Sequence, residues 1–369
     1  MEPIPVINIT DLYHPPQDPG DNFDLVMPYA LPEIDLRAVI LDVTEAFRRP
    51  STYDERTGYG DDTGPRDPGI IPVTQLNYIF DRNVPYGIGP FQQMRTPDDD
   101  MQDLPTFQQS GVDLILQTLM ASEKKVEITV FGSARALAVA YNREPDLLRR
   151  KVARVHLCAG ASEPHFLEWN VHLDPQAIVC LLQSDLPIDI YPCATGEGPF
   201  AYGRHNCFWR LPDLEFVRYM HPVLKRYLGY AIGRVERSDF LRALEEDLPK
   251  DVMARTYARV HNVWETAVWL NVSGRRLVLR RDDFFDIVAK GELEPGDAIL
   301  PNSLIPCSVK VGPDGRFHWE RTSEPTSFRM YDRKDPALNE RALRQALPNL
   351  YISFQPGSHM DAYFSGALG

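Results

Sequence analysis

The chain has 369 residues and a mass of 42.0 kDa, and its 43% hydrophobic and 25% charged residues are enough to bury a large core. A net charge of −13 and a pI near 5.2 argue against nucleic acid or an anionic membrane as the main partner, and no apolar run is long enough to predict a membrane span. The five scattered cysteines lack CxxC or Cys/His spacing, so we expect reduced thiols in a cytoplasmic protein, without zinc or a disulfide framework.

The beginning of the chain reads as a β-loop-α-β unit. Residues 6–10 form an apolar β-branched run that predicts a buried strand, and a Pro/Gly-rich turn follows it. A kinked helix is expected over residues 21–31 and a second strand over residues 36–41. Ligands of open α/β sheets bind beyond the carboxyl ends of the strands, which is where Asp11 and Glu45 lie.

Four carboxylates crowd the loop and the helix start after the first strand: Asp11, Asp18, Asp21 and Asp24. Asp21 opens the predicted helix, where an acid is a common N-cap and is favoured by the helix dipole. That structural role explains a single acid better than it explains four. Like charges in one short loop repel, and a hard cation with oxygen ligands, Ca²⁺ or Mg²⁺, relieves the repulsion. The segment therefore predicts a metal site.

The middle of the chain repeats a strand, tight turn and helix. Strands are predicted over residues 126–131, 152–157 and 186–191, and helices over residues 73–80, 107–120, 134–142 and 176–183. This repetition predicts an α/β fold with a doubly wound, mostly parallel sheet and helices on both faces.

The remaining segments are loops, helices and late strands. The loops at residues 51–69 and 96–105 are interpreted as long surface excursions, and residues 194–210 as a lid over the strand ends or as an ordinary surface loop. Helices are predicted over residues 214–234, 239–248, 261–270 and 339–346, and strands over residues 276–280, 308–311 and 316–319. We expect residues 1–369 to form a single domain with a C-terminal strand-rich extension of the sheet from about residue 271.

Four segments together carry a family resemblance. They are the acid-rich loop with the helix that ends at residues 32–34 (PEI), residues 131–160 (FGSARALAVAYNREPDLLRRKVARVHLCAG), residues 168–177 (EWNVHLDPQA) and residues 261–268 (HNVWETAV). Together they resemble the inosine-uridine nucleoside hydrolase family, whose members cleave the N-glycosidic bond of nucleosides with a bound Ca²⁺. The third segment is the most specific, because it matches that family's Glu-Phe-Asn-(three residues)-Asp-Pro-Glu-Ala signature.

The resemblance implies a Ca²⁺-dependent hydrolase, an N-glycosidase acting on a nucleoside or related small ribosyl N-glycoside, that assembles as a homo-oligomer, either a dimer or a tetramer. It implies Asp11 as general base and His261 as the acid that protonates the leaving base. The implied metal ligands are Asp11, Asp18, Asp21, Asn262 and the backbone carbonyl of Phe131. The predicted substrate contacts are Asn22, Glu45, Glu168, Trp169, Asn170 and Trp264, with Glu168 and Asn170 binding ribose hydroxyls and the tryptophans stacking on a base.

Two departures from the family pattern leave alternatives open. Asn262 stands where the family has a metal-binding Asp, and Gly20 where it has the first of two adjacent acids. One alternative is therefore a degenerate, non-hydrolytic protein that binds a nucleoside or ribose on the same fold. Another is a hydrolase of a different glycoside or amide, for which the long loops leave room. Taken alone, His261 also fits a structural histidine, and large aromatics are most often core.

Overall fold

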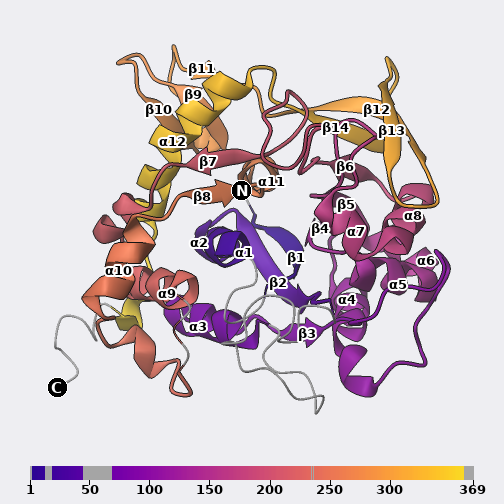
Figure 1. Ribbon diagram of the computed structural model, residues 1–369, viewed down its shortest axis with the longest axis horizontal. Coiled ribbons are helices and arrows are strands. Elements are labelled where there is room, and N and C mark those ends of the chain that lie inside the picture. The colour runs from indigo at the N-terminus through magenta and orange to yellow at the C-terminus, as the bar shows by residue number, and fades with distance from the viewer. Residues whose placement is uncertain (1, 13–18, 45–68, 234, 236, 361–369) are drawn as a thin grey trace.

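The computed structural model describes residues 2–12, 19–44, 69–233, 235 and 237–360. Asp18, Glu45 and nearly all of the loop at residues 51–69 lie outside these ranges, so what the sequence predicts for them stays a prediction. In the described part, nine strands form one sheet in the order β13-β12-β14-β6-β5-β4-β1-β2-β3 (Figure 1). These strands are β1 (Ile4–Thr10), β2 (Ile34–Leu41), β3 (Tyr86–Ile88), β4 (Val126–Phe131), β5 (Val152–Leu157), β6 (Ile188–Ile190), β12 (Ser303–Val311), β13 (Phe317–Arg321) and β14 (Phe328–Asp332).

The sheet is mostly parallel, as predicted. All neighbours from β3 to β14 pair in parallel, and only β12 runs antiparallel to its two neighbours, β14 and β13. The strand order reverses between β1 and β4, because the chain builds outward through β2 and β3 and then returns to the other side of β1. Such a reversal opens a crevice at the carboxyl ends of the two central strands. Thr10 and Phe131, the last residues of β1 and β4, are paired there.

Helices cover both faces of the sheet and bury two separate apolar cores. One core contains residues of α4 (Ser110–Ala121), α5 (Arg135–Arg143), α6 (Pro145–Lys151) and α8 (Pro175–Gln183). The other contains residues of α1 (Pro19–Asp24), α2 (Val26–Ala30), α3 (Ile70–Phe80), α9 (Pro222–Ile232), α11 (Thr266–Ser273) and α12 (Pro336–Ser353). Val6 and Ile7 of β1 belong to opposite cores, as the period of two in a strand requires.

The helix predicted over residues 21–31 is two short helices, α1 and α2, and the break comes at Leu25 and not at Pro28. Pro28 has no N–H to donate to the carbonyl of Asp24, four residues earlier, where α1 ends, so the break fits the predicted effect of this proline. Leu31 is extended ahead of Pro32, as expected for a residue before proline.

Three later helix predictions need correction. Residues 214–234 split into a 3₁₀ turn (Glu215–Tyr219) and α9, because Pro222 starts a new helix. Residues 239–248 hold only a 3₁₀ turn (Arg242–Leu244), and α10 (Lys250–Tyr257) follows. The acids after Leu244 would oppose the dipole at the C-terminus of a helix, and Pro249 disfavours helical conformation in the residue before it. Residues 261–270 begin as strand β8 (His261–Val263), which pairs antiparallel with β7 (Trp209–Leu211), and the helix α11 starts only at Thr266.

In the C-terminal part, β12, β13 and β14 widen the large sheet. The sequence prediction missed β14, the strand that joins the extension to β6. β9 (Arg276–Leu279), β10 (Phe285–Val288) and β11 (Ala298–Ile299) form a separate three-stranded sheet, and α12 is longer than the predicted helix at residues 339–346. No helix among the described residues has the length and apolarity needed to cross a bilayer.

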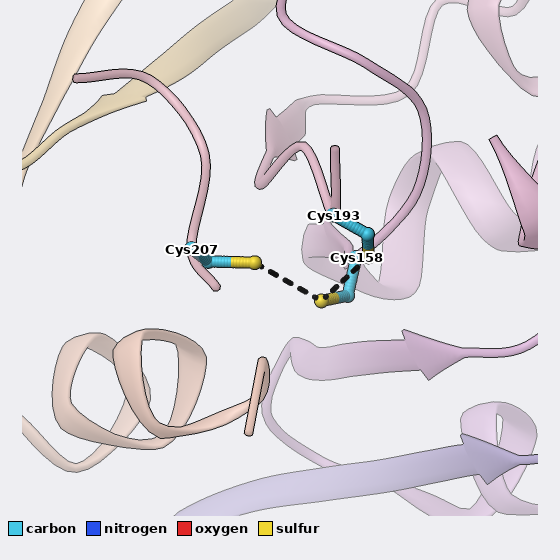
Figure 2. Close-up of side chains that lie close together, drawn as sticks. All are labelled: Cys158, Cys193 and Cys207. Carbon is cyan, nitrogen blue, oxygen red and sulfur yellow. Dashed lines mark hydrogen bonds between the residues drawn. The ribbon is translucent and has the colours of Figure 1, made fainter. Parts of the chain in front are cut away.

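The five cysteines are all free and buried. Three of them, Cys158, Cys193 and Cys207, come together next to the ends of β5 and β6 (Figure 2).

Candidate functional site

The first part of the candidate site lies where the strand order reverses. Asp11 follows β1 and is 5% exposed, and its backbone N–H donates to the carbonyl of Phe131 at 3.4 Å. Gly132 makes this approach feasible, because a Cβ atom there would lie 3.3 Å from the Cβ of Asp11. The structure thus brings together Asp11 and the carbonyl of Phe131, both predicted as metal ligands.

Helix α1 places further oxygen atoms beside Asp11. The hydroxyl of Thr10 donates to the carboxylate of Asp21, which is buried. Two tyrosines hold the helix from outside: Tyr227 donates to the carbonyl of Asn22 at 3.1 Å, and Tyr351 to that of Phe23 at 3.0 Å. Asp24, one of the four acids that predicted a metal site but not one of the implied ligands, is also buried here at 1% exposure.

A buried ionic network next to this crevice was missed from the sequence. Asp42 follows β2 and accepts a hydrogen bond from Ser133 at 2.7 Å, while Arg135 forms an ion pair with Asp174 at 2.7 Å. All these side chains are fully buried. Burial raises the pKa of Asp42, and the nearby charge of Arg135 opposes that shift. The rule that singles out Asp11, an acid directly after a strand, would also have found Asp42.

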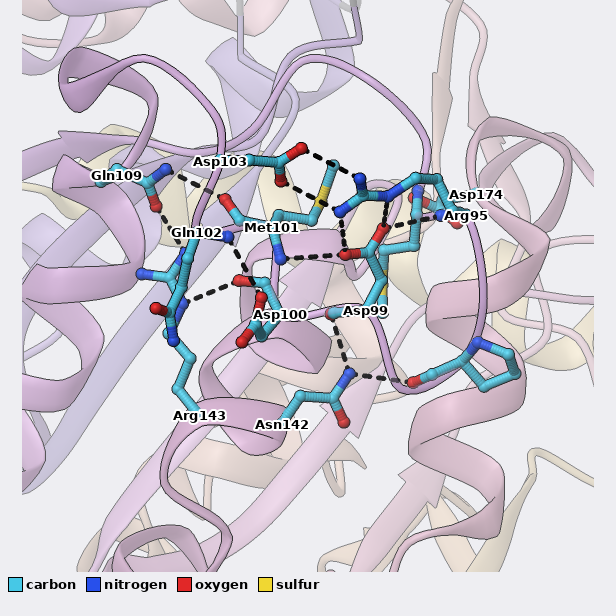
Figure 3. A network of polar contacts seen from close by, with 12 residues as sticks. Arg95, Asp99, Asp100, Met101, Gln102, Asp103, Gln109, Asn142, Arg143 and Asp174 are labelled. Carbon is cyan, nitrogen blue, oxygen red and sulfur yellow. Dashed lines mark hydrogen bonds and ion pairs between the residues drawn. The ribbon is translucent and has the colours of Figure 1, made fainter.

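Asp174 also anchors the loop at residues 96–105. Its carboxylate accepts from the backbone N–H of Met94 at 2.9 Å, and the next residue, Arg95, pairs with Asp99 and Asp103 (Figure 3). On the other side, Asn142 donates to the carbonyls of Pro97 and Asp99, each at 2.9 Å. The surface excursion predicted from the sequence is therefore tied to α5 and to the start of α8 through side-chain contacts.

The segment predicted to bind ribose lies beyond β5. Glu168 caps α7 (Trp169–Leu173), and its buried carboxylate accepts from the backbone N–H groups of Gly160 and Asn170 at 2.8 and 3.0 Å. Burial raises the pKa of Glu168 to about 7, against the opposing effect of these hydrogen bonds. Asn170 donates from its amide to the carbonyl of Cys158 at 2.9 Å, and Trp169 is 44% exposed. The carboxyl group of Glu168 thus holds the loop in shape, and its role toward ribose stays a prediction.

The segment at residues 261–268 is divided between strand β8 and the start of helix α11. His261 is buried with its ring 4.8 Å from that of Phe23, and burial lowers its pKa to about 3, so the ring is neutral at pH 7. Its Nε2 has no hydrogen-bond partner among the described residues. The amide oxygen of Asn262 accepts from Arg210 at 3.0 Å. Glu265, which the sequence analysis assigned no role, is buried at the start of α11.

An aromatic group covers this motif. Trp264 donates from Nε1 to the carbonyl of Cys193 at 2.9 Å, and its ring centroid lies 5.2 Å from that of Phe208. Phe200 packs on both rings and is still 54% exposed. Arg333, at the end of β14, holds this loop by donating to the carbonyls of Gly203 and Phe208 at 2.9 and 2.6 Å. The loop at residues 194–210 is thus fixed at its base and exposes an aromatic side chain; the lid role stays a prediction.

The amino-acid sequence is similar to those of known hydrolases over part of its length. No family model matches the chain. Over 188 residues it is 28% identical to the pyrimidine-specific ribonucleoside hydrolase RihA of Escherichia coli, a match that covers 46% of this chain and 56% of that relative. The match to RihA of Citrobacter koseri is 31% identical over 83 residues, 21% of this chain and 26% of the relative. The chain therefore aligns with about half, or less, of the length of these curated relatives.

The solved structures cover nearly the whole chain. A plant nucleoside hydrolase aligns with 93% of this chain and 98% of its own, with a TM-score of 0.52 at 14% identity. The purine-preferring ribonucleoside hydrolase of Gardnerella vaginalis covers 94% and 99%, with a TM-score of 0.51 at 15% identity. The chain thus resembles ribonucleoside hydrolases in sequence over part of its length and has the fold of nucleoside hydrolases over nearly all of it. The predicted resemblance and the predicted fold are thereby confirmed.

The metal that the nucleoside hydrolase resemblance implies can be compared with the donors present. At the crevice these are the carboxylates of Asp11 and Asp21 and the carbonyl of Phe131, so the set consists of oxygen atoms only. Oxygen donors with more than one negative charge suit a hard cation such as Ca²⁺. The residues therefore fit the implied group. Asn262 differs, because its amide oxygen is already hydrogen-bonded to Arg210.

Proposed function

We propose that this protein is a nucleoside hydrolase that cleaves the N-glycosidic bond of a nucleoside or a related ribosyl N-glycoside, with Ca²⁺ as its metal. The observation that carries the proposal is the pair of buried carboxylates, Asp11 and Asp21, at the strand-order reversal beside the carbonyl of Phe131. The sequence similarity to RihA over part of the chain and the likeness of fold along nearly the whole chain support it.

Each residue has a defined task in this proposal. Asp11, Asp21 and the carbonyl of Phe131 would hold the cation, and the predicted ligands Asp18 and Asn262 would complete the set. The bound cation would supply a water of lowered pKa. Asp11 would act as the general base toward the attacking water. Asn170 and Trp169, at the start of α7, face the sugar and the base, respectively, and Asn22, Glu45, Glu168 and Trp264 complete the substrate contacts.

His261 has a narrower role than the sequence alone implied. A ring with a pKa of about 3 is not an imidazolium at neutral pH, so in our proposal it donates a hydrogen bond to the leaving base from its neutral form. Replacing His261 with Ala should then slow natural nucleosides more than an activated nitrophenyl riboside, which needs little help to leave. Equal losses on both substrates would argue against any contact with the leaving group.

A second candidate is a non-hydrolytic protein that binds a nucleoside or ribose. The hydrogen bond from Arg210 to Asn262 favours it, because it occupies an oxygen atom that the metal would otherwise use. In this case the cation site would be too weak to activate a water, and the protein would retain a ligand without releasing free ribose.

One experiment separates the two. Ca²⁺ binding is measured by calorimetry, and ribose release is then measured on the same sample with uridine, cytidine, inosine, adenosine and guanosine, with and without chelator. Binding together with chelator-sensitive release supports the hydrolase. Nucleoside binding without release supports the second candidate. The panel includes pyrimidines and purines because the relatives' names differ on this point.

Two further parts of the proposal concern the assembly and its location. We propose a homo-oligomer, a dimer or a tetramer, which sedimentation analysis tests. We propose a cytoplasmic location, which the five free, buried cysteines support because thiols stay reduced there.

A further inference from the structure

Three buried sulfur atoms converge beside the candidate site, and the proposed reaction does not use them. Cys158 follows β5, Cys193 follows β6, and Cys207 lies just before β7 (Figure 2). The Sγ of Cys158 lies 3.5 Å from that of Cys193 and 3.7 Å from that of Cys207, and all three lie within 4.8 Å of one another. Their exposed fractions are 1%, 6% and 2%.

The distances between the sulfur atoms suit three thiolates on one shared metal ion better than they suit a disulfide. Three thiolates at 2.3 Å from one tetrahedral metal lie about 3.8 Å apart. The sulfur atoms are already close to that separation, whereas a disulfide would use two of them at about 2 Å and leave the third. The sequence hides this cluster because adjacent parallel strands, β5 and β6, bring together cysteines that are 35 residues apart.

The thiolate and not the thiol is the form that binds a metal, so binding of a cation would release the thiol protons and neutralise the charge left on the sulfur atoms.

We propose that Cys158, Cys193 and Cys207 form a site for one thiophilic cation of the Zn²⁺ or Cu⁺ class. Soft sulfur donors select such ions over Ca²⁺, which takes oxygen, so this site is chemically separate from the one at Asp11 and Asp21. It departs from the expectation, based on spacing along the chain, that zinc is absent.

The ion would brace the wall of the candidate substrate site. The carbonyl of Cys158 accepts the hydrogen bond of Asn170, and the carbonyl of Cys193 accepts that of Trp264, each at 2.9 Å. Linking the two sulfur atoms through one metal fixes the two backbone segments that hold these side chains. This consequence rests on the proposed function, whereas the binding of the ion does not.

The test uses the whole chain, reduced and stripped of metal under anaerobic conditions, with Ca²⁺ in excess to occupy oxygen sites. Co²⁺, as a spectroscopic substitute for Zn²⁺, and Cu⁺ are titrated separately. We expect one equivalent to bind with a thiolate-to-metal charge-transfer band, and X-ray absorption to count three sulfur atoms at about 2.3 Å for Zn²⁺. Absence of the band with both ions, or fewer than three sulfur atoms, would overturn the proposal.

Variants assign the ligands. Cys158→Ser and Cys207→Ser should each lose the charge-transfer band, and Cys307→Ser, which removes an equally buried thiol outside the cluster, should keep it. An undiminished band in Cys158→Ser would contradict the assignment. Should circular dichroism show that a cluster variant does not fold, the sulfur count in the unmodified protein decides. Ribose release is measured in parallel, so that failure of the proposed reaction leaves the metal result intact.

Discussion

Two regions at the carboxyl ends of the central strands offer different metal donors, and we call them the oxygen region and the sulfur region. After β1 and at the start of α1, the donors are the oxygen atoms of Asp11 and Asp21, set among hydrogen bonds and buried charges. After β5 and β6, the donors are the sulfur atoms of Cys158 and Cys193, whose nearest polar partners are each other and Cys207. The fold does not dictate which side chains follow the parallel strands. Hard oxygen donors can therefore follow β1, while soft sulfur donors follow β5 and β6.

The largest expected effect breaks the oxygen region alone. Asp11→Asn keeps the shape and removes the base, so kcat should fall by about 10²–10⁴-fold, measured as ribose release at saturating substrate. Thiophilic metal binding should not change. Asp35→Asn, a partly exposed acid on β2, is the control. Retained turnover in Asp11→Asn would remove Asp11 as the base.

The next effect concerns the charges that support the oxygen region. Arg135→Met leaves Asp174 and Asp42 buried without their cation and should lower the free energy of unfolding by about 3–5 kcal/mol in urea. Arg149→Met, which breaks exposed pairs with Asp146 and Asp185, should lower it far less, because solvent screens exposed ion pairs. Similar losses in both variants would mean that burial does not distinguish the pairs.

Glu168, between the two regions, should make stability depend on pH. Its folded pKa of about 7 lies above the ordinary value of 4.5, so its contribution to stability is complete below pH 4.5 and is lost as the pH rises through 7. Relative to Glu168→Gln, the unmodified protein should lose stability on the order of 3 kcal/mol across this window in urea titrations. Parallel pH profiles would show that Glu168 is not protonated in the folded state.

The smallest expected effect is a gain in Ca²⁺ affinity at the oxygen region. Arg210→Met releases the amide oxygen of Asn262, and the loss of a competing hydrogen bond worth about 1 kcal/mol should tighten Ca²⁺ binding about five-fold in calorimetry. An unchanged affinity would place Asn262 outside the metal site and would favour the non-hydrolytic alternative.

Periodicity and turn residues predicted most of the sheet, because β1, β2, β4 and β5 are short segments rich in apolar residues. The strand β14 was missed since it is defined by its pairing with β6. Likewise β8 was predicted as helix, and only its pairing with β7 makes it a strand. Local patterns carry information about burial and helix ends, and little about long-range pairing.

Part of the geometry of the candidate site follows from the same local signals, whereas the roles of its residues stay predictions. Asp11, Asp21 and Phe131 come together because they follow or begin elements that the sequence marks clearly. The network of Asp42, Arg135 and Asp174 and the cluster of three cysteines were not predicted, because their members come from different strand ends and have no fixed spacing along the chain. Only the strand order brings them together.

The contacts of Arg333 impose an order on assembly. This residue lies directly after β14. It fixes the backbone of the loop at residues 194–210, the aromatic loop, through hydrogen bonds to Gly203 and Phe208, more than a hundred residues earlier in the sequence. During synthesis, the aromatic loop therefore has to wait for the last strand before it can take its final shape. Shortening the chain from its C-terminal side as far as β14 would leave that loop without its anchor and would also remove Tyr351 of α12, which holds α1.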